Sequence, residues 1–370
     1  MDRVTRRSLI SGSLGLAGLV AAGCTGSGRT SPPSSAPTSA TPSASASPTS
    51  SSDTRPRAPL TGLLISEPSA LSHAAVAVKV PNLRRECPQL GIDQADIVVV
   101  EPNGPSYTRL CAVFHSRFPA GVNPVRSVRP VDVPLLSPMR PVLANTGAMQ
   151  WVVNYLHHYA DYIEDMPYLA MQGTSAYSID PSRVYQINGT YYYDKAVVAH
   201  PAVLAKLATT MTKPPQPYLP YAFTEAEVST AAGKSARTIS VPYGSGHTYD
   251  MSYTYDAGSH RYLRSEPWGK HVTTNGVRIS TDNVLVIRAH WSMDKIWSGT
   301  GGTDPVVDII NASGNFHFAH AGRYVTGTWK KAGVDKLFSF TCADGSPLKM
   351  APGTTWIELP QKDADIRITA

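Results

Sequence analysis

Residues 93–132 read DQADIVVVEPNGPSYTRLCAVFHSRFPAGVNPVRSVRPVD. Within this stretch, the β-branched run 97–101 and the apolar run 109–115 are short and are bounded by turn residues. This pattern predicts two buried strands joined by a loop that carries Asn103 and Gly104. Similar runs at 75–80 and 142–146 predict two further strands. The region around the quoted stretch is therefore expected to be built on β-structure.

Two segments outside these strands have helical spacing. Apolar residues recur every three or four positions in 148–159 and 201–211, which predicts helices, and Pro201 suits a first helical turn. Strands and helices together predict a mixed α/β domain over residues 59–213. Four prolines within 214–220 cannot continue a helix or a central strand, so we place a domain boundary there.

Residues 214–370 have a different pattern, made of short alternating runs separated by turns that contain Gly and Asp. The runs lie at 238–241, 248–255, 261–264, 283–290, 306–310, 316–319, 324–330, 337–342 and 355–359. This spacing predicts a mainly antiparallel β domain. The expected fold class is α+β, with an N-terminal mixed α/β domain followed by a C-terminal β-rich domain.

The N-terminus has the pattern of an export signal and a membrane anchor. In residues 1–23, Arg6 and Arg7 precede a short, weakly apolar run, which resembles a twin-arginine signal. The run ends in LVAAGC, which resembles a lipobox and predicts acylation, for example by palmitate, at Cys24. Residues 24–58 are rich in Ser, Thr and Pro and have almost no large apolar side chains, which predicts a disordered tether. We therefore expect a lipid-anchored protein on the extracytoplasmic face of the cell membrane.

Most of the net positive charge of the chain lies in this N-terminal signal and tether. The 370 residues carry a formal net charge of +6. Residues 1–58 contain six arginines and two aspartates, which leaves a net charge of only +2 for the folded part. A nearly neutral folded part argues against nucleic acid as a partner and favours specific local contacts.

The cysteines and histidines do not predict a metal or cofactor site. There is no CxxC pair and no HExxH motif, and His317 and His320 would face opposite sides of a strand. Outside the cytoplasm a disulfide is allowed, and Cys87 with Cys111 is the pair that could form within one domain. The alternative is that both thiols are unpaired.

Charged residues gather at the strand ends and loops of the quoted stretch. They are Asp96, Glu101, Arg109, Arg126, Arg129 and Asp132, with Ser127 between two of the arginines. Strand ends and loops are where α/β proteins place their sites, and arginine forks match carboxylates and phosphates. One interpretation is a site for an anion or an acidic sugar. The other is an internal network of arginines and carboxylates that ties the loops to the sheet.

Several motifs resemble those of the YerB-type bacterial lipoproteins, a two-part family of unknown function. They are PLTGL at 59–63, QADIV at 94–98, PVRSVR at 124–129, GTW at 327–329 and PGTTWI at 352–357. The resemblance covers residues 59–360 and implies a membrane-tethered protein of the cell envelope, without an established reaction. The family usually has a Pro-His-Asn step late in its first half, whereas this chain has Ala199-His200-Pro201.

Two functions remain open from the sequence. The first is a binding lipoprotein that holds an envelope glycan or a partner protein in a cleft lined by Glu101, Arg109, Arg126, Ser127 and Arg129, with clustered tyrosines as amphipathic surface. The second is a cell-wall hydrolase or transferase, with Glu101 as general acid or base and Asp96 or Asp132 as its partner carboxylate. No GxSxG motif surrounds Ser127, so a serine triad would need His200 from a distant segment.

Overall fold

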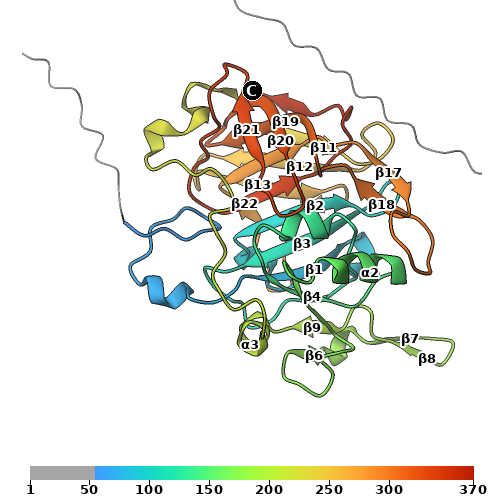
Figure 1. Ribbon diagram of the computed structural model, residues 1–370. Coiled ribbons are helices and arrows are strands. Elements are labelled where there is room, and N and C mark those ends of the chain that lie inside the picture. Colours follow the sequence, from blue (N-terminus) through green and yellow to red (C-terminus); the bar gives the residue numbers. More distant parts are fainter. Residues whose placement is uncertain (1–54) are drawn as a thin grey trace, which may run out of the picture. The chain divides into compact units, whose positions relative to one another are not determined.

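The computed structural model describes residues 55–370, which form one compact unit (Figure 1). The predicted export signal, the lipidation site Cys24 and nearly all of the tether lie outside the described residues. In the described part, no helix has both the length and the apolar character needed to cross a membrane.

The main element is an eleven-stranded mixed sheet. Its centre consists of β2 (Ile97–Pro102), β3 (Thr108–Phe114) and β1 (Val76–Asn82), which pair antiparallel. From β2 the sheet continues through a parallel pairing to β22 (Thr355–Glu358), and from β1 through a parallel pairing to β4 (Val142–Asn145). The remaining strands are β5 (Glu164–Pro167), β10 (Lys234–Ser235), β16 (Asn283–Ile287), β19 (Ala312–His320), β20 (Arg323–Lys331) and β21 (Ser339–Cys342).

A second sheet of six strands comes from the second half of the chain and is antiparallel throughout. Its members are β11 (Thr238–Pro242), β12 (Asp250–Asp256), β13 (Arg261–Glu266), β14 (Gly269–Lys270), β15 (Ser280–Thr281) and β23 (Arg367–Thr369). Three two-stranded sheets complete the β-structure: β6 (Tyr177–Ile179) with β9 (Val197–Ala199), β7 (Tyr185–Ile187) with β8 (Thr190–Tyr192), and β17 (Trp291–Asp294) with β18 (Asp304–Val307).

The helices are few and short. They are α1 (Asp132–Leu136), α2 (Gln150–His158), α3 (Pro201–Leu207), and the 3-10 turns η1 (Pro68–Leu71), η2 (Arg84–Glu86), η3 (Ile92–Gln94), η4 (Pro181–Arg183), η5 (Glu225–Glu227) and η6 (Ser229–Ala232). The predicted helix 201–211 ends early because the Glu164 carboxylate accepts the backbone N–H groups of Thr209, Thr210 and Met211. The fold is consequently mainly β, with less helix than the α+β prediction implied.

The central strands of the large sheet are buried on both faces, as their uninterrupted apolar runs predict. Ile97 and Val99 of β2 point into a core that also contains residues of α1 and α2. Their neighbours Val98 and Val100 point into a second core, which the six-stranded sheet shares. The predicted strands at the centre of both segments are confirmed, and one sheet joins the segments. The division after residue 213 stays a prediction about sequence segments, since β2 and β22 lie on either side of it and pair directly.

The cysteines of the described chain are all free thiols. Cys111 is buried in β3, and the Cys87 thiol donates to Glu266 Oε1 at 3.7 Å. A bridge between Cys87 and Cys111 is thus not formed in this structure.

Candidate functional site

A buried charge cluster lies on the α1 side of the large sheet. Lys79 of β1 binds both Glu101, at the end of β2, and Asp132, at the start of α1, where its Nζ lies 2.7 Å from Asp132 Oδ1. All three side chains have an exposed fraction of 0%. Charges are this deeply buried only when they are paired, so the cluster ties two central strands to the first helix.

The pKa values of Glu101 and Lys79 are shifted because one buried lysine lies between two acidic side chains. Burial and the neighbouring Asp132 raise the pKa of Glu101 to about 8, although Lys79 opposes the shift. Burial lowers the pKa of Lys79, but Asp132 and Glu101 outweigh it, so that its pKa is raised. Lys79 is therefore charged at neutral pH, where the Glu101 carboxyl is largely protonated.

Arg109 and Arg129 lie next to this cluster and hold the loop between β2 and β3. Arg109 donates to the Ser127 carbonyl at 3.0 Å and to Asn103 Oδ1 at 3.5 Å, and Arg129 Nε donates to the same Asn103 oxygen at 2.8 Å. The backbone N–H of Arg129 donates to Asp132 at 2.7 Å. Burial and the nearby Arg129 lower the pKa of Arg109 to about 9. The two arginines thus connect the cluster to the loop that begins at Asn103.

Arg126 belongs to a separate pair of contacts. It binds Glu86 of η2, and its Nη2 lies 2.7 Å from Asp194 Oδ2. Its backbone N–H donates to the Lys79 carbonyl at 2.9 Å. Arg126 and Arg129 therefore have different partners, so the two arginines of the PVRSVR segment do not converge on one anion.

Two predicted candidates lie away from the cluster. Asp96 stands before β2, at the opposite end of that strand from Glu101, and accepts the backbone N–H groups of His115 and Ser116 at 2.6 and 2.7 Å. His200 binds the Ala120 carbonyl through Nδ1 and Ser178 Oγ through Nε2, at 2.7 and 2.8 Å, and does not contact Ser127. The structure thus brings together Glu101, Arg109, Arg129 and Asp132. Asp96 lies apart from them and binds the backbone directly after β3.

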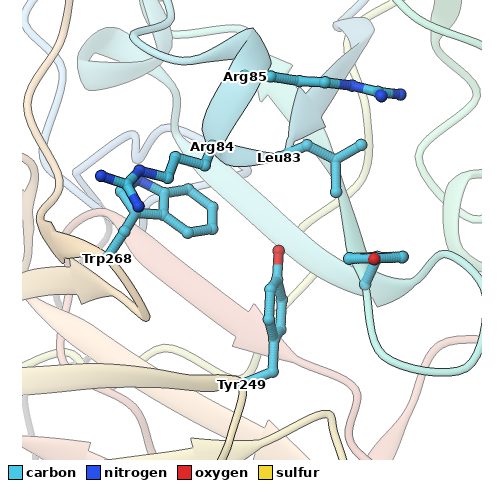
Figure 2. Close-up of a pocket in the computed structure, with 6 residues that line it drawn as sticks. Leu83, Arg84, Arg85, Tyr249 and Trp268 are labelled. Atoms are coloured by element: carbon cyan, nitrogen blue, oxygen red, sulfur yellow. The ribbon is translucent and has the colours of Figure 1, made fainter.

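An open pocket of about 400 Å³ lies beside the β2–β3 loop. It is lined by Leu83, Arg84, Arg85, Tyr107, Tyr249 and Trp268, and we call it the Arg–aromatic pocket (Figure 2). The residues come from three segments: the region of η2, the end of the β2–β3 loop, and the β12–β14 part of the six-stranded sheet. The pocket is therefore formed by η2 and by loops that directly adjoin strands of the large sheet and of the six-stranded sheet.

The aromatic rings of the pocket are set in fixed positions. The rings of Tyr107 and Tyr249 meet edge to face at 5.8 Å, and those of Tyr249 and Trp268 lie 6.1 Å apart. The Tyr249 hydroxyl donates to the Asn82 carbonyl at 2.9 Å, and Asn103 N–H closes the β2–β3 loop on the Tyr107 carbonyl at 2.7 Å. Sequence reasoning pointed to Tyr249 as part of a tyrosine-rich surface, but it missed Tyr107 and Trp268, which lie far apart in the chain and have no shared motif.

A larger pocket, of about 710 Å³, also adjoins the β2–β3 loop, where it is lined by Pro105 and Ser106, by Trp291 and by residues of the segments 242–247 and 361–367. Here His247 bridges Asp250 and Asp365, at 2.7 and 3.2 Å. The hydrogen bond to Asp250 holds the pKa of His247 above its ordinary value. Across the described residues, no group of three or more His, Cys, Asp or Glu side chains is arranged to hold a metal ion.

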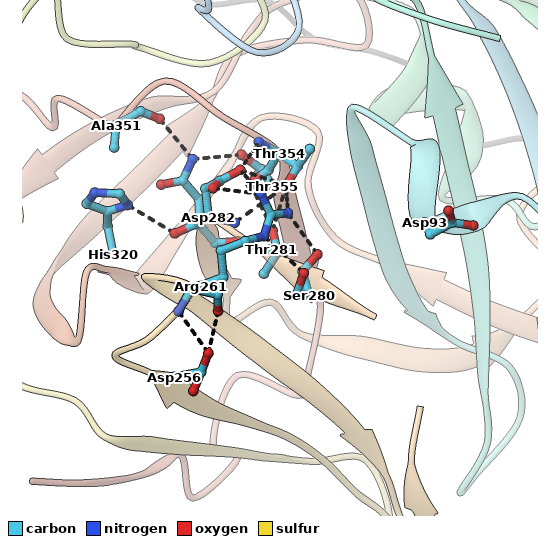
Figure 3. Close-up of polar contacts among 12 residues, drawn as sticks. Asp93, Asp256, Arg261, Ser280, Thr281, Asp282, His320, Ala351, Thr354 and Thr355 are labelled. Carbon is cyan, nitrogen blue, oxygen red and sulfur yellow. Dashed lines mark hydrogen bonds and ion pairs between the residues drawn. The ribbon is translucent and has the colours of Figure 1, made fainter. Parts of the chain in front are cut away.

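A polar network fixes the second half of the chain to the large sheet (Figure 3). Arg261 binds Asp282 at 2.9 Å and Thr354 Oγ1 at 2.9 Å, and the Asp282 carboxylate accepts the Thr354 N–H at 2.7 Å. Thr354 directly precedes β22, the strand that pairs with β2. This network holds the PGTTWI segment in place and serves the fold rather than a pocket.

Comparisons with known proteins identify the family of this chain. Residues 60–202 and 239–357 match the N-terminal and C-terminal domains of the family described as protein of unknown function (DUF3048). YerB of Bacillus subtilis (strain 168), named as a candidate lipoprotein, is 27% identical over 316 residues, which is 83% of this chain and 87% of YerB. The crystal structure of Bacillus subtilis YerB aligns with a TM-score of 0.66 and 22% identity, covering 85% of this chain and 100% of that one. The chain therefore belongs to the YerB-type, two-part family of proteins of unknown function.

Proposed function

We propose that this protein is a membrane-anchored lipoprotein on the extracytoplasmic face, and that it binds a cell-envelope glycan in the Arg–aromatic pocket. The observation that carries the proposal is the convergence of Tyr107, Tyr249 and Trp268 on one open pocket. Aromatic rings offer flat apolar faces against which sugar rings stack, and their polar edges remain available to hydroxyl groups. A concave pocket with several aromatic side chains and a few polar groups is the usual form of a ligand site.

The anchoring part of the proposal rests on the N-terminal sequence and on the relative. The signal-like residues 1–23 and the lipobox ending at Cys24 are followed by a Ser/Thr/Pro-rich tether, and YerB is itself named as a candidate lipoprotein. A coil of about thirty residues spans roughly 30 Å, so the folded unit would act close to the membrane. Replacement Cys24→Ala should move the protein to the soluble fraction of a cell lysate, and continued membrane retention would contradict the anchor.

In this proposal Glu101 and Asp132 are positioning residues. Both have an exposed fraction of 0% and share Lys79, so no glycosidic bond reaches them in the structure described. Their cluster instead supports Arg109 and Arg129, which hold Asn103 at the start of the loop that ends in Tyr107. The predicted charge cluster thus acts on the binding pocket through the β2–β3 loop.

The test is a binding experiment with purified cell-wall glycan and the full chain in detergent. Replacement Trp268→Ala should weaken glycan binding by about tenfold or more, because removal of a central aromatic contact commonly costs 2 kcal/mol or more, as an order of magnitude. Trp297→Ala is the matched control, since Trp297 packs against Tyr155 and His158 and does not line the pocket. A wild-type protein that does not bind glycan, or that instead binds an envelope protein through this pocket, would overturn the proposal.

A further inference from the structure

We infer that the Arg–aromatic pocket selects an anionic glycan, one whose sugar units carry phosphate or carboxylate groups. The inference rests on the proposed function and adds the chemical class of the ligand. It is carried by two neighbouring arginines, Arg84 and Arg85, that line the pocket together with the aromatic rings.

The first observation is that these two arginines lack a carboxylate partner. Both side chains are exposed, and among residues 55–370 neither makes an ion pair or a side-chain hydrogen bond. Arg126, by contrast, is neutralised by Glu86 and Asp194. Glu86 directly follows Arg85, but its carboxylate is buried and engaged with Arg126. The acid nearest in sequence is thus unavailable to the pocket.

The second observation concerns the other acid near the pocket. Glu266 lies two residues before Trp268 and hydrogen-bonds to its side chain, but it is only 5% exposed, does not line the pocket, and lies 3.6 Å from Arg264 and 3.7 Å from His271. None of the six lining residues of the described pocket is acidic. The side chains that line the pocket therefore carry two positive charges and no negative one.

Charge and aromatic surface together define the ligand. Guanidinium groups match the geometry of phosphate and carboxylate oxygens, and they bind both with charge-assisted hydrogen bonds. The rings of Tyr249 and Trp268 both line the pocket, with centroids 6.1 Å apart and planes tilted by 59°, so that a sugar ring can lie against either of them. A ligand that satisfies both features is a sugar chain with an anionic group next to a sugar ring.

The experiment titrates the full chain, in detergent, with three probes. They are a poly(glycerol phosphate) oligomer substituted with sugar, an oligogalacturonate and a neutral chito-oligosaccharide, which represent phosphate, carboxylate and no charge. We expect at least one anionic probe to bind about tenfold more tightly than the neutral probe at low salt, and this preference to shrink as salt screens the arginines. The comparison of the two anionic probes tells phosphate from carboxylate.

The variants separate charge from fold. Arg84→Ala/Arg85→Ala should remove the preference for the anionic probe, whereas Arg84→Lys/Arg85→Lys should keep part of it, because the charge remains without the planar fork. Lys206→Ala/Lys213→Ala removes the same charge from exposed positions outside the Arg–aromatic pocket and should change nothing. Thermal unfolding checks that each variant is folded.

Two negative results have different meanings. Equal binding of neutral and anionic probes, with loss of binding in Trp268→Ala and no effect of the arginine pair, would overturn this inference and leave the proposed function standing. If the wild type binds none of the probes and no purified wall glycan, both fail together.

Discussion

Lys79 Nζ lies 2.7 Å from Asp132 Oδ1, and both side chains are completely buried where a central strand meets the first helix. Lys79 also binds Glu101, whose pKa of about 8 keeps it largely protonated at neutral pH, so the removal of this one cation leaves the Asp132 carboxylate without its counter-charge and the Glu101 carboxyl without its hydrogen-bond partner. Lys79→Met should therefore lower the free energy of unfolding at neutral pH by about 3–5 kcal/mol. Chemical denaturation measures this change. The double variant Lys79→Met/Glu101→Gln should recover part of the loss, and a single variant as stable as wild type would contradict the role of the cluster.

The pH dependence of stability tests Glu101. Its pKa in the folded state is raised from 4.5 to about 8, so between these values the folded protein holds a proton that the unfolded chain has lost. Stability linked to Glu101 is complete below pH 4.5 and falls as pH rises towards 8. Glu101→Gln removes this titration, so the variant should gain stability relative to wild type across the same window. The free energy of unfolding is measured by denaturant titration as a function of pH for both proteins. If the two curves run parallel between pH 4.5 and 8, Glu101 does not titrate in that range and the prediction is wrong.

Asn103 connects the buried cluster to the pocket. Its side-chain oxygen accepts hydrogen bonds from Arg109 and Arg129. Asn103→Ala should lower the free energy of unfolding by about 1–3 kcal/mol, because the buried Arg109 and the half-buried Arg129 lose an acceptor. It should also weaken glycan binding by loosening Tyr107. Asn103→Asp keeps the acceptor and should preserve binding, and hydrogen exchange of residues 103–107 measures the loosening directly. Unchanged exchange in Asn103→Ala would contradict the proposed link.

The glycine-rich loop 299–302 packs closely on α2. Gly299 has φ +136°, and a Cβ there would lie 2.6 Å from the Trp151 backbone nitrogen. Gly299→Ala should destabilise the protein by about 1–3 kcal/mol, since the added Cβ meets backbone that cannot move aside and the left-handed conformation disfavours alanine. Gly302→Ala is the matched control, because a Cβ at Gly302 has no atom within 4 Å. Equal stabilities of the two variants would contradict the close packing.

The positions of the strands could be predicted from the sequence, but the pairing of one strand with another could not. The run 97–101 is β-branched and apolar, so its strand was predictable from local pattern alone. Its pairing with β22 was not, since β22 lies more than 250 positions away and nothing local encodes a parallel pairing at that separation. The helical content was overestimated because the contact of Glu164 with residues 209–211 is a tertiary effect.

The candidate site was likewise only partly predictable, because its residues come from segments that lie far apart in the chain. The acids and arginines of residues 96–132 stood out in the sequence, but their central partner, Lys79, lies in a separate apolar run. A single lysine inside such a run was the available signal for a buried ion pair. The pocket was harder to predict, because Arg84, Tyr107 and Trp268 come from segments that only the folded chain brings together.

The most direct test of the central claim is hydrogen–deuterium exchange of the full chain with and without saturating envelope glycan. We predict that protection on binding is confined to the segments 83–86, 103–108 and 249–269, which contain the lining residues of the Arg–aromatic pocket. Protection of segments 242–247 and 361–367 alone would place the glycan in the pocket of His247 and contradict the account, as would a complete absence of protection in the three predicted segments.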